Sequence, residues 1–253
     1  MKFAGMTAVI TGGGQGIGAA VARALAAEGA AIIVAARTLD RVKAVAESIE
    51  RGGGKARAVR CDVTDPSSVH ALASAASRQG AAVDILINNA GMAHSAPLHK
   101  ITLDDWQRVF AVNATGTFLC TQGFVPGMLE RKRGAVVNVA SVAGLAGARY
   151  IAAYAAAKHA VIGFTRSVAA ELEGTGVTCN AVCPGFVDTE MTKDSVARVV
   201  QKTGKSPDAA LAAMLASSSQ QRLITPDEVA HAVLALCDFT GKRPNGTAVT
   251  IAD

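Results

Sequence analysis

Short runs of consecutive apolar residues, rich in valine and isoleucine, recur along the whole chain. Continuous apolar runs of about four to eight residues are typical of strands that are covered on both faces, as in a parallel sheet. The pattern therefore predicts seven buried strands, at Thr7 to Ile10, Ala31 to Ala35, Ala56 to Arg60, Val83 to Ile87, Ala135 to Val139, Val177 to Val182 and Thr247 to Ile251.

Longer segments with helical periodicity lie between these runs. They are Gly18 to Glu28, Leu39 to Arg51, Ser67 to Arg78, Leu103 to Glu130 and Ile151 to Glu173. Capping signals mark two helix starts: Thr102 with Asp105, and Thr225-Pro226-Asp227-Glu228. Strand and helix in alternation indicate a parallel sheet with right-handed crossovers.

No linker or change of composition divides the chain. We therefore expect residues 1–253 to form a single doubly wound, Rossmann-type α/β domain, with a seven-stranded parallel sheet and helices on both faces. The region 189–222 fits the alternation less well, because it has helical pieces at Ser195 to Lys202 and Ala209 to Ser217. This region is interpreted as an insertion that covers the substrate as a lid.

Composition narrows the function classes. The net charge is +5 and the pI about 9.1, but the basic residues are scattered, and Arg131-Lys132-Arg133 is the single basic run. This distribution argues against a nucleic-acid partner and fits a solvated surface with modest attraction for an anionic cofactor. Five cysteines without Cys-x-x-Cys spacing predict neither a disulfide framework nor a zinc site, and no metal is expected.

Nothing in the pattern predicts a targeting or membrane segment. The chain runs from Met1 directly into an apolar strand, without room for a secretory signal. The most apolar long stretch, Ala135 to Ala157, contains Asn138 and Arg149, which a bilayer core would penalise. We therefore expect a cytoplasmic protein without membrane contact.

A glycine-rich loop, Thr11-Gly12-Gly13-Gly14-Gln15-Gly16-Ile17-Gly18, joins the first strand to a helix. A backbone without side chains can approach a pyrophosphate, and the helix N-terminus favours its charge. The alternative is a plain glycine-rich turn, but the strand before and the helix after favour a dinucleotide site.

The spacing Gly-x-x-x-Gly-x-Gly resembles that of the short-chain dehydrogenase/reductase family. NAD-preferring members of that family carry an acid at the end of the second strand, where this chain reads Ala35-Ala36-Arg37-Thr38. Arg37 would attract the 2′-phosphate of NADP(H), so the resemblance implies that NADP(H) is preferred, with NAD(H) as the second option. A surface arginine, or one that stacks on the adenine of either cofactor, is the alternative.

Three further segments match the family. Cys61-Asp62-Val63 resembles the adenine-contacting segment, although Asp62 would also serve as a helix cap. Asn88-Asn89-Ala90-Gly91 matches the Asn-Asn-Ala-Gly signature, and Pro184-Gly185 with Val187 and Thr189 resembles the nicotinamide-contacting segment. The resemblance thus implies cofactor contacts from Gly12, Gln15, Gly16, Ile17, Gly18, Arg37, Asp62, Val63, Asn89, Ala90, Gly91, Tyr154, Lys158, Pro184, Gly185, Val187 and Thr189.

Tyr154 and Lys158 are four residues apart on a predicted helix and therefore share a face. An ammonium about 5 Å from a phenol, at an effective dielectric of ~20, favours the phenolate by ~3 kcal/mol. This geometry predicts a lowered tyrosine pKa, suited to acid-base catalysis near neutrality.

Ser141 precedes Tyr154 by 13 positions, which reproduces the family pattern Ser-x12-Tyr-x3-Lys. The resemblance implies that Ser141 binds the substrate oxygen and that Asn113, in Asn113-Ala114-Thr115-Gly116, holds a water in a proton relay to Lys158. Each residue alone has a structural alternative as a loop, core or surface side chain. All four residues occur in the family's order, downstream of the glycine loop, and this combination favours a catalytic role.

The resemblance spans essentially the whole chain and implies hydride transfer between a nicotinamide and a carbonyl or alcohol, with Tyr154 as proton donor. A non-catalytic redox sensor would not need Tyr154 and Lys158, and an extended epimerase or dehydratase has different glycine spacing and a larger C-terminal domain. An NAD-dependent dehydrogenase of small alcohols or hydroxy acids is the runner-up.

The substrate is the least determined feature. The segment Asn180 to Val187 resembles 3-oxoacyl and polyketide ketoreductases and hydroxybutyrate dehydrogenases, so a 3-oxoacyl thioester is the first substrate hypothesis. The candidate pocket residues are Met92, His94, Ser95, Ala143 to Tyr150, Phe186 and Met191, with His94 as a ligand for an acyl carboxylate or thioester. Family members commonly form tetramers through the two long helices, so a homotetramer or dimer is expected.

Overall fold

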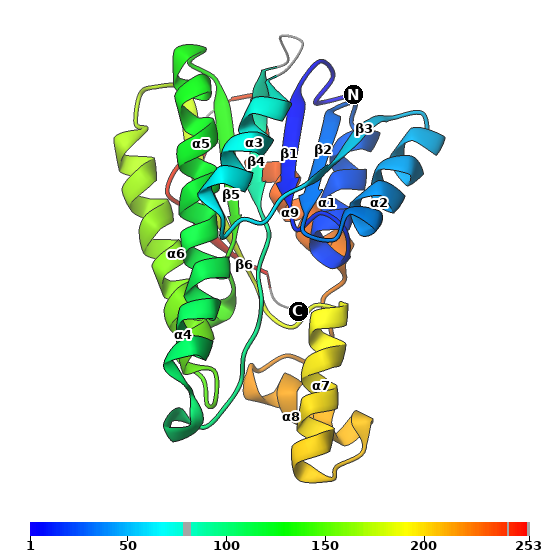
Figure 1. Cartoon of the computed structure of the whole chain (residues 1–253), viewed down its shortest axis with the longest axis vertical. Helices are drawn as coiled ribbons and strands as arrows, with labels where there is room; N and C mark the ends of the chain where they lie inside the picture. Colours follow the sequence, from blue (N-terminus) through cyan, green and yellow to red (C-terminus); the bar gives the residue numbers. More distant parts are fainter. Residues whose placement is uncertain (78–81, 242, 252–253) are drawn as a thin grey trace.

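The computed structural model describes residues 1–77, 82–241 and 243–251, and within them seven strands form one parallel sheet in the order β3-β2-β1-β4-β5-β6-β7 (Figure 1). The strands are β1 (Thr7–Thr11), β2 (Ala31–Ala36), β3 (Lys55–Arg60), β4 (Val83–Asn88), β5 (Gly134–Val139), β6 (Val177–Pro184) and β7 (Ala248–Ile251). Each predicted strand is therefore confirmed, with ends shifted by at most two residues. The predicted α/β fold class is also confirmed.

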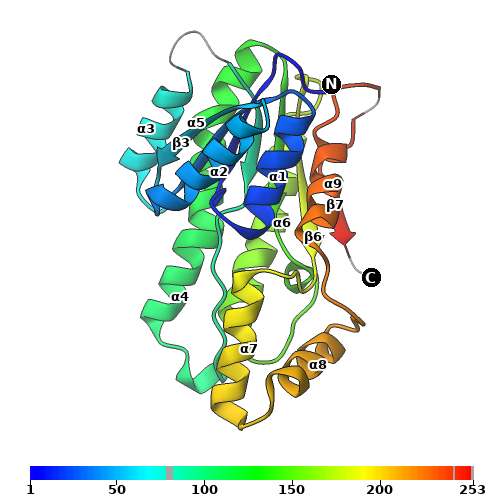
Figure 2. The same ribbon diagram turned by 90° about the vertical axis from the view of Figure 1, so that its right-hand side faces the viewer.

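Helices cover both faces of the sheet, as Figures 1 and 2 show. On one face lie α1 (Gly16–Ala27), α2 (Leu39–Arg51) and α9 (Pro226–Leu236). On the other lie α3 (Pro66–Ala76), α5 (Gly116–Glu130) and α6 (Ala152–Glu171), and α4 (Leu103–Phe110) packs on α6. Arg78, the predicted end of the third helix, lies outside the described residues.

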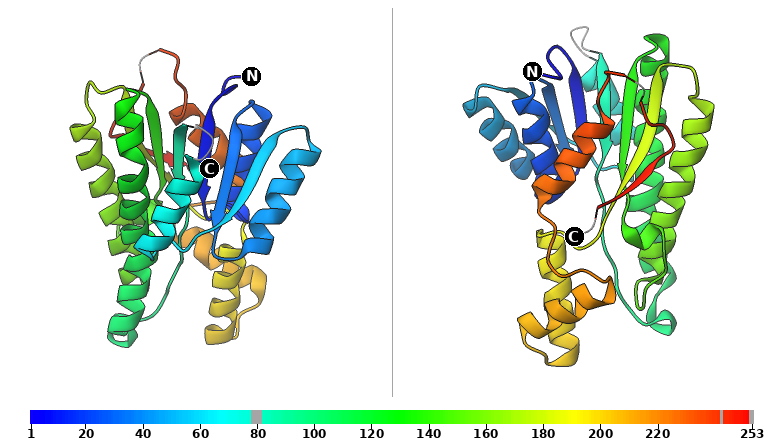
Figure 3. Two further views of the ribbon diagram at one scale, coloured as in Figure 1. Left: turned by 45° about the horizontal axis from the view of Figure 1, so that its top comes forward. Right: turned by 180° about the vertical axis from the view of Figure 1, so that it is seen from behind.

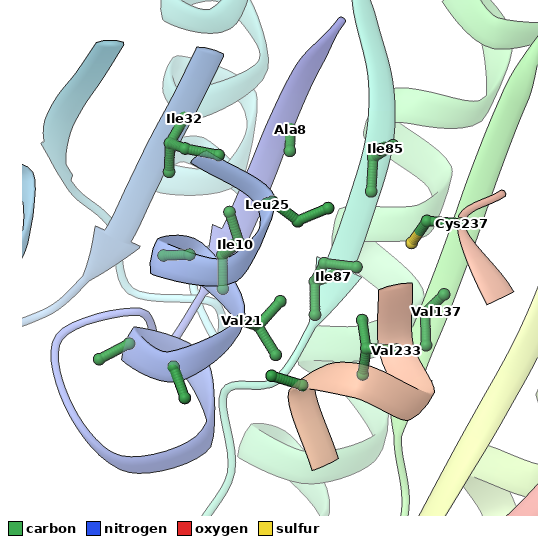
Figure 4. Close-up of a cluster of buried hydrophobic side chains, with 14 of the residues drawn as sticks. Ala8, Ile10, Val21, Leu25, Ile32, Ile85, Ile87, Val137, Val233 and Cys237 are labelled. Carbon is green, nitrogen blue, oxygen red and sulfur yellow. The ribbon is translucent and has the colours of Figure 1, made fainter. Parts of the chain in front are cut away.

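Alternation of side chains along the strands divides the core into two layers. In β1, Ala8 and Ile10 face α1 and α9, whereas Val9 faces the opposite helices. Figure 4 shows the first layer, in which Val21 of α1 and Val233 of α9 meet the strand residues. Because the strands are buried on both sides, their sequences read as continuous apolar runs rather than as alternating ones.

Two helix starts form as their sequences predict. The hydroxyl of Thr102 accepts from the N–H of Asp105 at 3.0 Å, and that of Thr225 accepts from the N–H of Glu228 at 3.2 Å. In both cases the acidic side chain returns a hydrogen bond to the capping residue, which completes a capping box.

The predicted continuous helix from Leu103 to Glu130 is wrong in its middle. A π-helical turn, Ala111–Thr115, separates α4 from α5. The side-chain amide of Asn113 donates to the carbonyl oxygen of Val109 at 2.9 Å, the acceptor that the backbone N–H of Asn113 would use in a regular α-helix. The extra residue in this turn directs Asn113 into the interior, where it is buried.

Two helices lie beyond the carboxyl ends of the strands, away from both faces of the sheet (Figures 1 and 3). They are α7 (Glu190–Thr203) and α8 (Pro207–Ser217), so the helical pieces expected in region 189–222 are confirmed and α7 begins earlier than predicted. Their position next to the strand ends gives them access to any ligand bound there.

The basic run makes contacts within the protein. Arg131 donates to the carbonyl oxygen of Val83 at 2.6 Å, and the Arg133 guanidinium lies 4.9 Å from the centroid of the Phe239 ring. These contacts support the interpretation of the run as ordinary structure. None of the described helices is long and apolar enough to cross a membrane.

Candidate active site

The carboxyl ends of the strands surround a cavity of about 1680 Å³. It lies where the strand order reverses between β1 and β4, the usual place for ligands in an open α/β sheet. Single-ligand pockets are typically about 300–1,000 Å³. The cavity is therefore large enough for a dinucleotide together with a substrate.

The cavity wall brings together almost all the residues selected from the sequence. All four candidate catalytic residues line it, and so do the cofactor candidates Gly12, Gln15, Gly16, Ile17, Arg37, Asp62, Val63, Asn89, Ala90, Gly91, Pro184, Gly185, Val187 and Thr189. Gly18 does not line it. A Cβ atom at Gly18 would lie 2.4 Å from Nδ2 of Asn89 and 2.5 Å from the Gly12 oxygen, so this glycine permits close packing behind the loop.

The glycine loop forms a cradle with the shape that a pyrophosphate needs. Gly12 and Gly16 have φ of 63° and 51°, a region that favours glycine. A Cβ atom at Gly12 would lie 2.8 Å from the Cα of Ala90, and Asn89 fixes the loop by donating to the oxygens of Thr11 and Gly12 at 3.0 and 3.1 Å. The loop leads into the N-terminus of α1, so the residues present fit a dinucleotide phosphate.

Two arginines lie at the end of the cavity next to β2. Arg37 was selected from the sequence, but Arg41 was missed. Arg41 lies against the glycine loop, because a Cβ atom at Gly14 would come within 2.9 Å of its Cβ, and its guanidinium donates to Gln15. A guanidinium at this place beside the glycine loop fits a phosphate site.

Asp62 lies at the same end of the cavity and is not a helix cap. Its Oδ1 accepts from the N–H and the hydroxyl of Thr64 at 3.0 and 2.8 Å. The residue that caps α3 is Asp65, whose side chain accepts from the N–H of Ser67. Asp62 is therefore held at the cavity wall, where its predicted contact with adenine stays a prediction.

The proposed catalytic side chains approach each other from β5 and α6. The Ser141 hydroxyl accepts from the N–H of Ala143 at 3.1 Å and donates to the Pro184 oxygen at 3.3 Å. It lies close enough to the Tyr154 phenol to affect the pKa of that group. Lys158 Nζ lies 5.7 Å from the centroid of the Tyr154 ring and donates to the Val139 oxygen at 2.7 Å. Serine and lysine thus flank the phenol.

The predicted lowering of the Tyr154 pKa is wrong for this structure. Burial raises the pKa of the phenol, and the hydrogen bond from Ser141 opposes this only in part. Burial also lowers the pKa of Lys158 to about 8, because its ammonium is removed from water. Desolvation of both groups outweighs their attraction, so Tyr154 is protonated at neutral pH, which is the form that can donate a proton to a carbonyl.

Asn113 lies beside Gly91 and Lys158. A Cβ atom at Gly91 would come within 2.9 Å of Asn113 Oδ1 and 3.7 Å of Lys158 Nζ. Both N–H groups of the Asn113 amide are used, because they donate to the oxygens of Met92 and Val109, and its Oδ1 accepts from the N–H of Met92. Its role in a water relay stays a prediction.

The candidate substrate residues divide into two groups. His94, Ser95, Ala143, Ala146 to Tyr150, Phe186 and Met191 line the cavity. Met92, Gly144 and Leu145 do not line it, and their contact with a substrate stays a prediction. Met92 packs in the apolar cluster of Val109 and Ala153, Gly144 fits against the Lys158 backbone, and Leu145 is exposed to solvent.

His94 is held by the N-terminal turn of α4. Its Nε2 lies 3.5 Å from Oδ1 of Asp105, whereas its Nδ1 is buried and has no hydrogen-bond partner among the described residues. A buried imidazole nitrogen without a partner is costly, which fits a polar ligand atom. The predicted contact of His94 with an acyl group stays a prediction.

The lowered Lys158 pKa predicts a pH dependence of stability. Between pH 8 and 10.5 the unfolded chain binds a proton that the folded protein lacks, so the free energy of unfolding rises with pH over this window. Across this pH window, we expect the free energy of unfolding of wild type to rise by about 3 kcal/mol relative to that of Lys158→Met. Each unit of pKa shift corresponds to about 1.36 kcal/mol. Urea unfolding of both proteins at several pH values measures the difference, and parallel curves would show that Lys158 is not desolvated.

A glycine cradle at the switch point of a doubly wound sheet, with a serine, a tyrosine and a lysine around the same cavity, defines a dinucleotide-dependent oxidoreductase. The model of the short chain dehydrogenase family matches residues 6–199, and the chain belongs to this family. Its members are oxidoreductases that act on hydroxyl or keto groups with NAD(P).

Several relatives are similar over most of the chain. A 3-oxoacyl-[acyl-carrier-protein] reductase of Synechocystis sp. is 43% identical over 74% of this chain and 76% of its own. A 2-(S)-hydroxypropyl-CoM dehydrogenase of Xanthobacter autotrophicus is 37% identical over 96% of this chain and 93% of its own. Among solved structures, an actinorhodin polyketide ketoreductase variant with NADPH has a TM-score of 0.92 at 32% identity, covering 98% of this chain and 95% of its own.

Proposed function

We propose that this protein is an NADP(H)-dependent reductase that converts a ketone to a secondary alcohol or catalyses the reverse reaction. The observation that carries the cofactor choice is the pair Arg37 and Arg41 at the cavity end beside β2, where no acid ends the strand. Two guanidinium groups there fit a 2′-phosphate, and the end of β2 carries no carboxylate that would repel it. The similar ketoreductase solved with NADPH supports the same choice.

The chain's own residues would perform the proton chemistry. When bound, the nicotinamide supplies or accepts the hydride. In the reducing direction the Tyr154 phenol gives its proton to the carbonyl oxygen, and the Ser141 hydroxyl donates a hydrogen bond to that oxygen as negative charge develops. The ammonium of Lys158, next to the Tyr154 ring, stabilises the phenolate that remains.

The substrate is a ketone, with a 3-oxoacyl thioester as the first hypothesis. The similarity to a 3-oxoacyl-[acyl-carrier-protein] reductase and to a polyketide ketoreductase supports this class. Met191 and Phe186 line the cavity, and α7 and α8 lie beyond the strand ends (Figure 3). We therefore propose that residues 189–222 cover the substrate. In this proposal the whole chain forms one domain.

We propose a homo-oligomer, a tetramer or a dimer, with α4, α5 and α6 in the interface. Large apolar side chains are exposed on α4 and α5, among them Leu103 at 70% and Phe118 at 42%. Phe118 of α5 packs edge-on against Phe164 of α6, with ring centroids 6.2 Å apart. Large apolar side chains exposed on neighbouring helices favour association.

The double variant Arg37→Gln/Arg41→Gln tests the cofactor assignment. Hydrogen bonds to a charged group contribute about 1.5–3 kcal/mol each, so loss of two should lower kcat/KM for NADPH about 10²- to 10⁴-fold while that for NADH changes little. The control is Arg51→Gln, which removes the same charge at the far end of α2. Equal losses with both cofactors, or a wild type that prefers NADH, would contradict the assignment.

A further inference from the structure

One face of helix α7 lines the cavity. The residues on it include Met191, Ser195, Arg198 and Lys202, which are spaced by four, three and four positions. This is the spacing of a single helix face. Its outer half therefore presents two cations, one helical turn apart, to the cavity.

Neither cation is neutralised. No carboxylate forms an ion pair with Arg198 or Lys202 among the described residues. Arg198 donates from Nη2 to the Ser195 hydroxyl at 2.9 Å, but its Nε is buried and has no partner in the part of the chain described. An unsatisfied N–H on a charged group is costly, so the site favours a ligand that supplies an acceptor.

The charge of the cavity wall also favours an anionic ligand. The lining Arg and Lys residues in the described chain are Arg37, Arg41, Arg149, Lys158, Arg198 and Lys202, against the acids Asp62 and Glu190. Of the two acids, Asp62 is held by Thr64, and Glu190 pairs with Lys193 at 3.0 Å. A wall with this surplus of positive charge attracts anions.

The cofactor does not account for the cations on α7. Thr189, which precedes α7, touches the glycine loop, because a Cβ atom at Gly16 would lie 3.0 Å from its Cγ2. Arg198 lies nine residues further, about 13 Å along the helix at 1.5 Å per residue. The arginines that fit a 2′-phosphate belong to other segments, the end of β2 and the first turn of α2.

The cations lie instead near the loops that carry the substrate candidates. Lys202 donates to the Ser95 oxygen at 3.3 Å, which connects α7 to the loop after β4. That loop is joined to the loop after β5 by the N–H of Ala96, which donates to the Tyr150 oxygen at 2.8 Å. Arg149, in the second loop, also lines the cavity.

We infer that Arg198 and Lys202 form an oxyanion subsite, and that the substrate is a ketone with a carboxylate, sulfonate or phosphate group at the end remote from its carbonyl. A small rotation of the Arg198 side chain would present Nε and Nη2 to the anion, with Nη2 exchanging the Ser195 hydroxyl for it. Lys202 would exchange the Ser95 carbonyl for the same anion. This inference rests on the proposed reduction of a ketone in the same cavity and adds the class of substrate.

The test compares substrates that differ only in charge. Reduction with saturating NADPH is measured for oxo-carboxylates of increasing chain length, each against its methyl ester, and for a 3-oxoacyl coenzyme A thioester against its uncharged N-acetylcysteamine analogue. We expect wild type to favour the charged member at least tenfold in kcat/KM for one of these series. A preference in the oxo-carboxylate series indicates a carboxylate as the anion, and a preference in the thioester series indicates a phosphate.

Arg198→Gln and Lys202→Gln should each lower kcat/KM for the charged member about tenfold through KM, and leave the rate with the uncharged member within twofold. Lys205→Gln, two residues beyond the end of α7 and outside the cavity wall, is the matched control and should keep the preference. A wild type that does not discriminate by charge, or variants that lose both substrates equally, would overturn the subsite.

A failure of the proposed reductase function has a different signature. If wild type reduces no ketone of either kind with either nicotinamide, binding of the oxo-carboxylates is measured by calorimetry. Binding that is lost in Arg198→Gln and retained in Lys205→Gln supports the subsite without the reaction. No binding by wild type in any series overturns both.

Discussion

Tyr154→Phe lowers kcat about 10²- to 10⁴-fold, the usual contribution of a positioned general acid, and leaves the Kd for NADPH nearly unchanged. Phenylalanine keeps the ring that packs against Val109 and Ala157, so the fold and the cavity remain. What is lost is the phenolic proton beside Ser141. Stopped-flow or steady-state absorbance of NADPH, with calorimetry for binding, measures both quantities.

The comparison variant is Tyr150→Phe, because the chain has two tyrosines and Tyr150 also lines the cavity. Its side chain is 61% exposed, and the residue lies outside α6 and its Lys158. We expect its kcat to fall less than tenfold. Equal losses in the two variants would mean that proton donation does not reside in Tyr154.

Gly12→Ala raises the Kd for NADPH about 100-fold or more. The new Cβ would lie 2.8 Å from the Cα of Ala90, a backbone atom that cannot give way without displacing the loop. The positive φ of 63° adds strain, and strained backbone costs about 1–3 kcal/mol at each such residue. Isothermal calorimetry measures binding, and thermal unfolding reports the accompanying loss of stability.

Gly53→Ala is the matched control for this prediction. Gly53 has a φ of 83°, so alanine is strained there too, but a Cβ atom would meet nothing within 4 Å. We expect a similar or smaller loss of stability with unchanged cofactor binding. If Gly12→Ala binds NADPH as well as Gly53→Ala does, the glycine loop is not the phosphate cradle.

The sheet could be predicted from the sequence because its strands are buried on both faces, so that each strand is an uninterrupted apolar run. The π-helical turn could not be predicted in the same way. The stretch from Leu103 to Glu130 has continuous helical periodicity, and the turn depends on the contacts of the Asn113 amide with Met92 and Val109. The geometry of this turn is decided by a contact with a residue that is distant in the sequence, and not by local helix propensity.

The same limit applies to the site. Arg37 can be selected from the sequence because it follows the second predicted strand where an acid would stand, but Arg41 acquires a role only because α2 starts against the glycine loop. The direction of the Tyr154 pKa depends on how deeply both it and Lys158 are buried, and spacing does not report burial. Arg198 lay within the predicted lid, where only the structure shows that its Nε is buried.

The most direct test of the central proposal is spectrophotometric turnover with NADPH and with NADH, using a panel of 3-oxoacyl thioesters, diketones and quinones. We predict that NADPH is consumed with formation of the alcohol, and that kcat/KM is higher with NADPH than with NADH. Consumption with NADH alone would contradict the cofactor assignment. No consumption of either, together with no binding of either by calorimetry, would contradict the proposal that the protein is an NADP(H)-dependent reductase.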